Sequence, residues 1–286
     1  MLLQRGAAWL AFVLVLGACV PPEQAARVVA YDDDTLAGQI QARGVLVVGI
    51  DPTYPRLSAP AGPGAYEGFL VDLAARFAEA MGVEIAYKTA PSRLLPTLAR
   101  AKVIDVGMPL LPITERSVRR ANLLDPYYVA HQMLLVERGS PISQVADLAG
   151  ETVCSAAHGE TATDLSAVEP SLEVVRAERA AGCLKRLRAG EVAAISAPDY
   201  DLIGLAATTP GLEIVGDELS TFGVGPVIGV GTAGFNSVLE AFMARFDEDG
   251  TWLELYRRWL APYLPEARTT APSMDLEDAA ALWPAT

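Results

Sequence analysis

The sequence has few of the residues on which metal sites and common hydrolases depend. It contains three cysteines and two histidines in 286 residues. His131 and His158 have no cysteine or acidic cluster at metal-ligand spacing, which argues against a structural zinc site. A Gly-x-Ser-x-Gly nucleophile elbow and a Gly-rich Lys-Ser/Thr phosphate loop are also missing. We therefore expect no metal, no cofactor and no enzymatic activity.

Basic residues are also few, and acidic residues outnumber them. Lysine and arginine together number 22 against 35 aspartates and glutamates, so the formal net charge is −13. Such a chain has no basic surface with which to hold phosphate backbones, which excludes nucleic acid as a partner. At 51% hydrophobic residues, the chain can bury a large core, and its length is typical of about two domains. We expect a monomer.

A hydrophobic run near the start, Ala7 to Leu16, follows the single charge of Arg5 and precedes two prolines. A run of this length is typical of a signal peptide rather than of a membrane span. The residues Leu16-Gly17-Ala18-Cys19 resemble a bacterial lipobox, which implies a signal peptide over residues 1–18 and lipidation of Cys19. The alternative is an ordinary cleaved signal that contains a cysteine. On either interpretation the protein is exported, and the lipobox places it on the periplasmic or extracellular face of a membrane, held by its lipid.

Cys154 and Cys183 are the two cysteines left once Cys19 is assigned to lipid. In an oxidising compartment an even pair favours a disulfide bond. We predict that the two are bridged; the alternative is a pair of buried free thiols.

The first half of the body alternates strands with helices. Residues 45–50 form an apolar run that predicts a buried strand. Apolar residues then recur at every fourth position over residues 69–81, which predicts an amphipathic helix. Residues 83–87 and 103–108 predict two more strands, with a helix from about Ser92 between them. This βαβ order indicates a largely parallel sheet.

A second α/β unit and a return of the chain are predicted further on. The expected strands are residues 152–155, 172–176 and 192–196, with helices near 161 and at 183–188, then an apolar run at 224–230 and helices at 237–246 and 251–260. Crossings near 134–137 and 222–225 would form a hinge over a cleft. The expected organisation is a linker over 19–36, lobe 1 over 37–135 and 224–265, lobe 2 over 136–223, and a C-terminal tail over 266–286.

Four stretches carry a family resemblance. They are Glu67-Gly68-Phe69-Leu70-Val71-Asp72-Leu73; Thr114-Glu115-Arg116 with Asp125-Pro126-Tyr127-Tyr128; Asp147-Leu148-Ala149-Gly150 leading to Gly159; and Asp249-Gly250-Thr251-Trp252 with Tyr256 and Trp259. In order and spacing they resemble the amino-acid-type (family 3) extracellular solute-binding proteins of ABC importers, over about residues 44–264. Within that family the cysteine pair and the Asp199 region are most similar to the glutamate-type proteins.

The resemblance implies a fold and a function. The fold is a type II periplasmic-binding-protein α/β fold, with two lobes, each a mostly parallel sheet flanked by helices, and a two-strand hinge. The function is capture of a small molecule, an amino acid or related carboxylate, and its delivery to an ABC permease. Two alternatives remain: a binding lobe for a signalling or periplasmic dehydrogenase system, and a dehydratase of the cyclohexadienyl type on the same fold.

The same resemblance assigns ligand-binding residues. Arg116 lies just inside a predicted helix that Thr114 can cap. It corresponds to the family's carboxylate-binding arginine, whose guanidinium can bind both carboxylate oxygens. Gly159 and Thr161 resemble the family loop that meets the same carboxylate, although Thr161 can equally be a helix N-cap. Asp199 is the candidate for the ligand ammonium, with Asp201 close by.

Two tyrosines are candidates for covering the ligand, and one loop departs from the family. Tyr54 begins a stretch similar to the family's ligand-covering loop, and Tyr66 is the other candidate; ordinary packing is the alternative for both. Where the family commonly has a small hydroxyl residue, this chain has Met108-Pro109-Leu110-Leu111. Since proline has no backbone donor, we expect an altered ammonium site.

Overall fold

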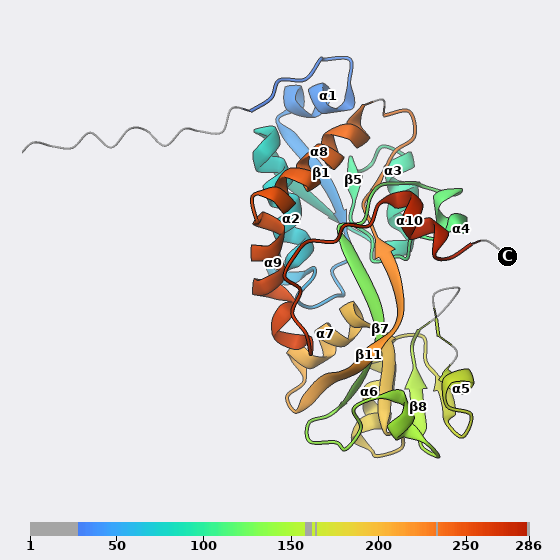
Figure 1. Ribbon diagram of the computed structural model, residues 1–286. Helices are drawn as coiled ribbons and strands as arrows, with labels where there is room; N and C mark the ends of the chain where they lie inside the picture. Colours follow the sequence, from blue (N-terminus) through green and yellow to red (C-terminus); the bar gives the residue numbers. More distant parts are fainter. Residues whose placement is uncertain (1–27, 158–161, 164, 233, 285–286) are drawn as a thin grey trace, which may run out of the picture.

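In the computed structural model the chain forms two α/β lobes joined by two long strands (Figure 1). The structure describes residues 28–157, 162–163, 165–232 and 234–284. The sheet of lobe 1 has the order β4-β1-β5-β12-β6. Its strands are β1 (Val45–Ile50), β4 (Glu84–Thr89), β5 (Val106–Gly107), β6 (Asn122–Leu123) and β12 (Val227–Ile228). Strand β1 is parallel to β4 and β5, whereas β12 is antiparallel to its neighbours β5 and β6.

The sheet of lobe 2 has the order β11-β7-β10-β8-β9. Its strands are β7 (Tyr128–Glu137), β8 (Thr152–Ser155), β9 (Glu173–Arg176), β10 (Ala194–Pro198) and β11 (Leu212–Val224). Strands β8, β9 and β10 are parallel, and β7 and β11 add an antiparallel edge. The expected two-lobed α/β fold with sheets flanked by helices is confirmed.

Helices cover both sheets. In lobe 1 these are α1 (Leu36–Arg43), α2 (Phe69–Met81), η1 (Ser92–Leu94), α3 (Leu95–Arg100), α4 (Glu115–Val118), α8 (Phe235–Glu248), α9 (Thr251–Trp259), η4 (Ala261–Tyr263) and α10 (Leu276–Ala281). In lobe 2 they are η2 (Val145–Leu148), α5 (Leu165–Val168), α6 (Ala180–Arg188) and α7 (Asp199–Thr208); a hairpin of β2 (Ala59–Gly62) and β3 (Ala65–Glu67) precedes α2. Helix α2 has the bounds that its fourfold spacing predicts, and Gly82 ends it in the left-handed conformation at φ 71°.

Strand β5 is shorter than the predicted strand over residues 103–108. The Asp105 carboxylate accepts a hydrogen bond from the backbone N–H of Val47 at 2.7 Å, and the Asp105 N–H donates to the Val47 carbonyl at 2.8 Å. The side chain of Asp105 thus takes the place of a backbone partner beside β1. Regular pairing begins only at Val106.

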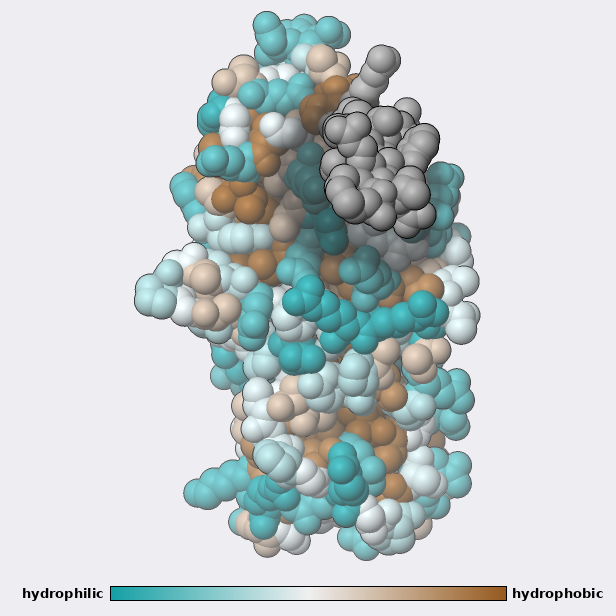
Figure 2. Space-filling model, turned by 90° about the vertical axis from the view of Figure 1, so that its left-hand side faces the viewer, coloured by the Kyte–Doolittle hydropathy of each residue, from teal (hydrophilic) through white to brown (hydrophobic). Residues whose placement is uncertain are grey.

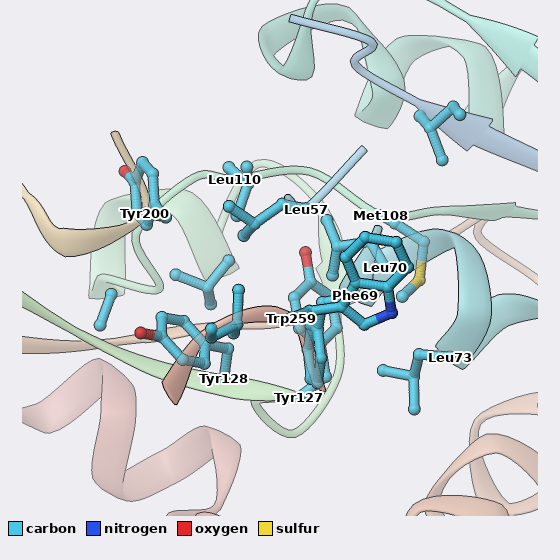
Figure 3. Packing of buried hydrophobic residues seen from close by; sticks show 14 of the residues in the cluster. Leu57, Phe69, Leu70, Leu73, Met108, Leu110, Tyr127, Tyr128, Tyr200 and Trp259 are labelled. Atoms are coloured by element: carbon cyan, nitrogen blue, oxygen red, sulfur yellow. The ribbon is translucent and has the colours of Figure 1, made fainter. Parts of the chain in front are cut away.

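Aromatic packing holds α2 and α9 together in the core of lobe 1. The rings of Phe69 and Trp252 meet edge to face with centroids 5.8 Å apart, and Trp252 stacks on Tyr256 at 5.1 Å. The indole N–H of Trp252 donates to the carbonyl of Tyr127 at 2.8 Å. Figure 3 shows Phe69, Tyr127 and Trp259 grouped within this cluster. Outside it, hydrophilic residues form a band at mid-height on the side that carries α2 and α9 (Figure 2).

Strands β7 and β11 connect the lobes. They pair antiparallel from Tyr128 opposite Val224 to Glu137 opposite Leu212, with an irregularity between Val215 and Ser220. In Figure 1 both strands extend between the two lobes, with the arrow of β11 pointing to the upper lobe. The paired segment is longer than the crossings expected from the sequence, and all residues of β7 except the last are buried.

Residues 268–284, the last that the structure describes, form a strap across these two strands. Arg268 donates to the carbonyl of Val129 on β7 at 2.9 Å, and the indole N–H of Trp283 donates to the carbonyl of Thr221 on β11 at 2.9 Å. Between them α10 buries Ala279 completely. The segment expected as a tail therefore packs on the hinge.

A disulfide joins Cys154 of β8 to Cys183 of α6, as predicted, with the two Cα atoms 5.6 Å apart. Both residues are fully buried. The bond fixes the start of α6 against the lobe 2 sheet.

We expect the double substitution Cys154→Ala/Cys183→Ala to lower the free energy of unfolding by about 3 to 4 kcal/mol, because a loop of this length is released in the unfolded chain. Urea unfolding of the oxidised wild type and the variant measures the difference. The single variant Cys19→Ser serves as a control that keeps the bridge. A loss below about 1 kcal/mol would contradict the expected stabilisation.

Candidate functional site

A cleft of about 680 Å³ lies between the two lobes. From lobe 1 it is lined by Asp51, Thr53, Tyr54, Pro55, Pro91, Ser92, Arg93, Leu110, Leu111 and Pro112; from the hinge strands by Gln132 and Phe222; and from lobe 2 by Ala156, Ala157, Glu178, Arg179, Ala180, Ala181, Pro198, Tyr200, Asp201, Gly204, Leu205 and Thr208. Many of these residues follow the carboxyl ends of parallel strands. That edge is where open α/β sheets bind their ligands.

The loops of lobe 1 are tied together by Asp51 and Ser92. The buried Asp51 carboxylate accepts hydrogen bonds from the N–H of Ser92 and from the hydroxyl of Thr53, both at 2.7 Å. The Ser92 hydroxyl in turn accepts from the N–H of Leu110 at 3.2 Å. Three loops of the cleft wall are thereby held in one arrangement.

The floor of the cleft is fixed in a similar way by Gln132 of β7. Its amide N–H donates to the Ser196 hydroxyl at 2.8 Å, and its amide oxygen accepts from the N–H of Thr163 at 2.7 Å. Gln132 is fully buried. Both the nitrogen and the oxygen of the Gln132 amide are therefore hydrogen-bonded to residues of lobe 2.

The two lobes touch through Tyr54 and Tyr200. Their rings meet edge to face with centroids 5.9 Å apart. Burial raises the pKa of the Tyr54 phenol, and the nearby carboxylates of Asp201 and Asp51 raise it further. Tyr54 therefore stays neutral at physiological pH and presents an aromatic ring with a polar end to the cleft.

Asp201 carries a carboxyl group of the cleft lining whose pKa is strongly raised. Burial raises the pKa of its carboxyl from 3.8 to about 7; Arg179 opposes this change and Asp51 adds to it. Near neutral pH the group is thus divided between its neutral and charged forms. A cation placed beside it would favour the carboxylate.

The ligand-binding residues predicted from the sequence do not all lie at the cleft. Tyr54 lines the cleft. Tyr66 lies in β3 with its ring 5.7 Å from that of Tyr87, and is not part of the described cleft lining. Gly159, Thr161 and Cys19 lie outside the described residues.

Arg116 lies on the short helix α4, which Thr114 caps as expected by accepting from the N–H of Ser117 at 3.1 Å. Its side chain is exposed, and the described lining of the cleft does not include it. The strap packs beside it, since the Glu115 N–H donates to the carbonyl of Trp283 at 3.2 Å. The sequence locates this helix correctly, but the structure does not bring Arg116 together with Tyr54.

Asp199 is buried beneath the hinge rather than in the described cleft lining. Its carboxylate accepts hydrogen bonds from the Tyr128 hydroxyl and the Tyr200 N–H, both at 2.7 Å. It borders a second hollow of about 530 Å³, shared with His131, Glu218 and Arg268. Asp201 lines the cleft instead. The two acids of the first turn of α7 therefore lie on opposite sides of that helix.

His131 and Arg268 complete this hinge cluster. The guanidinium of Arg268 contacts His131 Nε2, and the carboxylate of Glu218 lies 3.0 Å from the same nitrogen. Burial and the positive charge of Arg268 lower the pKa of His131 to about 4. The imidazole is therefore neutral at physiological pH.

Asp51, Arg93 and Arg179 also line the cleft, and none of them was expected from the sequence. Asp51 directly follows the buried strand β1, so its place at a carboxyl strand end was a usable signal. Arg179 precedes α6 by one residue, and no sequence pattern distinguishes it from the other arginines of that helix. Among the described residues, no group of three or more metal-ligating side chains is placed to hold a metal ion.

These features define a two-lobed binding protein whose site is the cleft over a two-strand hinge. The chain belongs to the bacterial extracellular solute-binding proteins, family 3; the family model matches residues 46–262. The strap with α10 lies beyond this match. None of the helices in the described part of the chain has the length and apolar character needed to span a bilayer.

Individual relatives agree with this membership. The chain is 30% identical over 211 residues to the glutamine-binding protein of Geobacillus stearothermophilus, covering 68% of this chain and 79% of the relative. It is 26% identical over 233 residues to the ABC transporter glutamine-binding protein GlnH of Bacillus subtilis, covering 79% and 85%. A mutant of ArgBP from T. maritima has a similar structure, with a TM-score of 0.60, 25% identity and coverage of 79% and 99%. The ancestral cationic amino acid solute binding protein AncCDT-1 shares the fold at a TM-score of 0.68 and 21% identity, with coverage of 78% and 99%.

We expect Asp199→Asn to remove part of the pH dependence of folding stability. Burial raises the pKa of Asp199 from 3.8 to about 7. The folded state therefore binds more protons than the unfolded state in this interval, so the stabilising contribution is full below about pH 4 and is lost as the pH rises through 7.

Urea unfolding of wild type and Asp199→Asn from about pH 4 to 8 measures this effect. The variant should gain stability relative to wild type as the pH rises, and the gain should level off above about pH 7. Asp247→Asn on the exposed face of α8 is the control. A difference between wild type and Asp199→Asn that does not change with pH would contradict the assignment.

Proposed function

We propose that this protein captures an amino acid or related small carboxylate in the interlobe cleft and delivers it to an ABC permease. The observation that carries the proposal is the cleft itself, which lies between lobes joined by two strands and is lined by groups of both charges. The named relatives support it, since they include glutamine-binding proteins and the L-cystine-binding protein TcyJ of Escherichia coli. These names favour capture over catalysis.

The hinge supports a mechanism in which the lobes close on the solute. Ligand contacts made by both lobes exist only in the closed state, so binding shifts the population towards closure. The Tyr54–Tyr200 contact already joins the lobes at one end of the cleft. A permease that contacts both lobes could then distinguish loaded from empty protein.

We expect isothermal titration calorimetry against amino acids and small carboxylates to find a ligand in the micromolar range, about −8 kcal/mol in binding free energy. The same ligand should lower the radius of gyration in solution scattering, because closure makes the protein more compact. Nucleosides and neutral sugars serve as controls. If these bind and no amino acid or carboxylate does, the proposed ligand class is wrong.

The second part of the proposal is a lipid anchor on Cys19, which would hold the protein near its permease outside the cytoplasm. We expect labelled fatty acid to be incorporated into wild type and not into Cys19→Ser. Wild type should sediment with membranes, whereas the variant should be released or keep its signal peptide. Wild type that takes up no label would exclude the anchor.

A further inference from the structure

The two hinge strands turn one face to the cleft and the other to a second hollow. Neighbouring residues of a β-strand point to opposite faces of the sheet. On β7, Gln132 lines the cleft, whereas His131 borders the hollow of about 530 Å³. On β11, Phe222 lines the cleft, and the Thr221 hydroxyl lies beside His131. Arg268, the first residue of the strap, lines the same hollow, so the strap covers the face of the hinge opposite the cleft.

The strap contacts both strands directly behind their cleft-lining residues. Arg268 donates to the carbonyl of Val129 on β7 at 2.9 Å and contacts His131 Nε2. The Nδ1 atom of His131 lies 3.0 Å from the Thr221 hydroxyl across the strand pair. At the other end of the strap, the indole of Trp283 donates to the Thr221 carbonyl at 2.9 Å. In Figure 1 the dark red chain that leads to α10 crosses the two strands at this level.

Helix α10 lies against β11 at a residue that has no side chain. A Cβ atom on Gly223 would lie 2.9 Å from the Cβ of Ala279 and 2.7 Å from the ring of Pro126. Ala279 is fully buried at this contact. A glycine in a strand allows such a close approach, so the sequence of β11 itself accommodates the strap.

The same strap is fixed to lobe 1 by hydrogen bonds. The N–H of Arg268 donates to the Tyr256 hydroxyl at 3.2 Å, and the N–H of Leu276 donates to the Asp125 carboxylate at 2.8 Å. A third hydrogen bond joins the strap to α4. The strap therefore moves as part of lobe 1 and reaches over the hinge strands.

The hollow beneath the strap separates lobe 1 from the irregular segment of β11. Residues 264–268 line it on one side and residues 216–218 on the other. Because the cleft and the hollow lie on opposite faces of the same two strands, a rotation that widens the cleft must narrow the hollow. Arg268 lies in this hollow, so its contacts oppose that rotation.

On the cleft side the lobes are already in contact. The rings of Tyr54 and Tyr200 meet with centroids 5.9 Å apart. A Cβ atom on Gly204 of α7 would lie only 3.1 Å from Cδ of Pro55. The strap thus makes its contacts in an arrangement in which the two lobes touch.

We propose that the strap limits how far the lobes open and holds the solute-free protein near the arrangement in which Tyr54 and Pro55 meet α7. Arg268 and Trp283 are its positioning residues, because each bonds a different hinge strand. This inference rests on the hinge motion of the proposed function and not on the identity of the solute. A solute then meets lobes that are already close together, which reduces the loss of freedom on closing.

The test is the distance between the lobes of the full chain without solute, measured by pulsed electron paramagnetic resonance. Spin labels on Thr89→Cys and Arg176→Cys report this distance. These exposed residues are the last of β4 and β9, the edge strands of the two sheets. The chain also carries Cys19→Ser, so that only the introduced cysteines are labelled, since Cys154 and Cys183 are bridged.

Arg268→Gln and Trp283→Phe should each lengthen the mean distance by about 3 Å or more and broaden its distribution, because the hinge then opens further. Arg268→Lys keeps a donor for Val129 and should give a shorter distance than Arg268→Gln. Glu277→Gln on the exposed face of α10 and Arg257→Gln on the exposed face of α9 are matched controls that should leave the distance unchanged. If one strap variant fails to fold, the other carries the test, since each breaks the contact with a different strand.

Gly204→Leu is the positive control, because its side chain would push Pro55 away and separate the lobes. If this variant lengthens the distance and the strap variants leave it unchanged or shorten it, the inference is overturned while the proposed function stands. The same holds if the matched controls lengthen the distance as much as the strap variants do. If neither Gly204→Leu nor the strap variants change the distance, the lobes do not move about this hinge, and the closure mechanism of the proposed function is overturned as well.

Discussion

The antiparallel pairing of β7 with β11 is the interaction on which the rest of the structure depends. These strands complete the sheet of lobe 2 and also carry the chain to and from lobe 1. Because the chain crosses between the lobes through this paired segment, bending of the two strands would open the cleft. The irregularity between Val215 and Ser220 lies within this pairing, where a bulge increases local twist.

Each wall of the cleft is stiffened by a different interaction. In lobe 1 the Asp51 carboxylate and the Ser92 hydroxyl replace missing backbone partners and connect three loops. In lobe 2 the disulfide between Cys154 and Cys183 stiffens the wall by joining β8 to α6. Rigid walls on a hinge suit the closure that we propose, because ligand contacts are then lost or made together rather than one by one.

The back of the hinge is covered by a buried polar cluster and by the strap. Asp199, Tyr128, His131 and Arg268 meet there, and their mutual hydrogen bonds compensate for removal from water. The strap contacts both hinge strands, so bending must either carry it along or strain its contacts. It lies outside the residues that the family model matches.

Hydrophobic periodicity determined the bounds of α2, the strand β1 and the βαβ order, and the even count of cysteines left after Cys19 determined the disulfide. The sequence did not determine which polar side chains meet in the cleft. Asp199 and Asp201 lie two residues apart on one helix, a rotation of about 200°, so they face opposite sides. Which side faces the cleft depends on how α7 packs against β7 and β11.

Likewise, α4 follows from its capping residues, but the side it turns to solvent depends on α10, about 160 residues further along the chain. Such contacts join residues distant in sequence, and only tertiary packing fixes them.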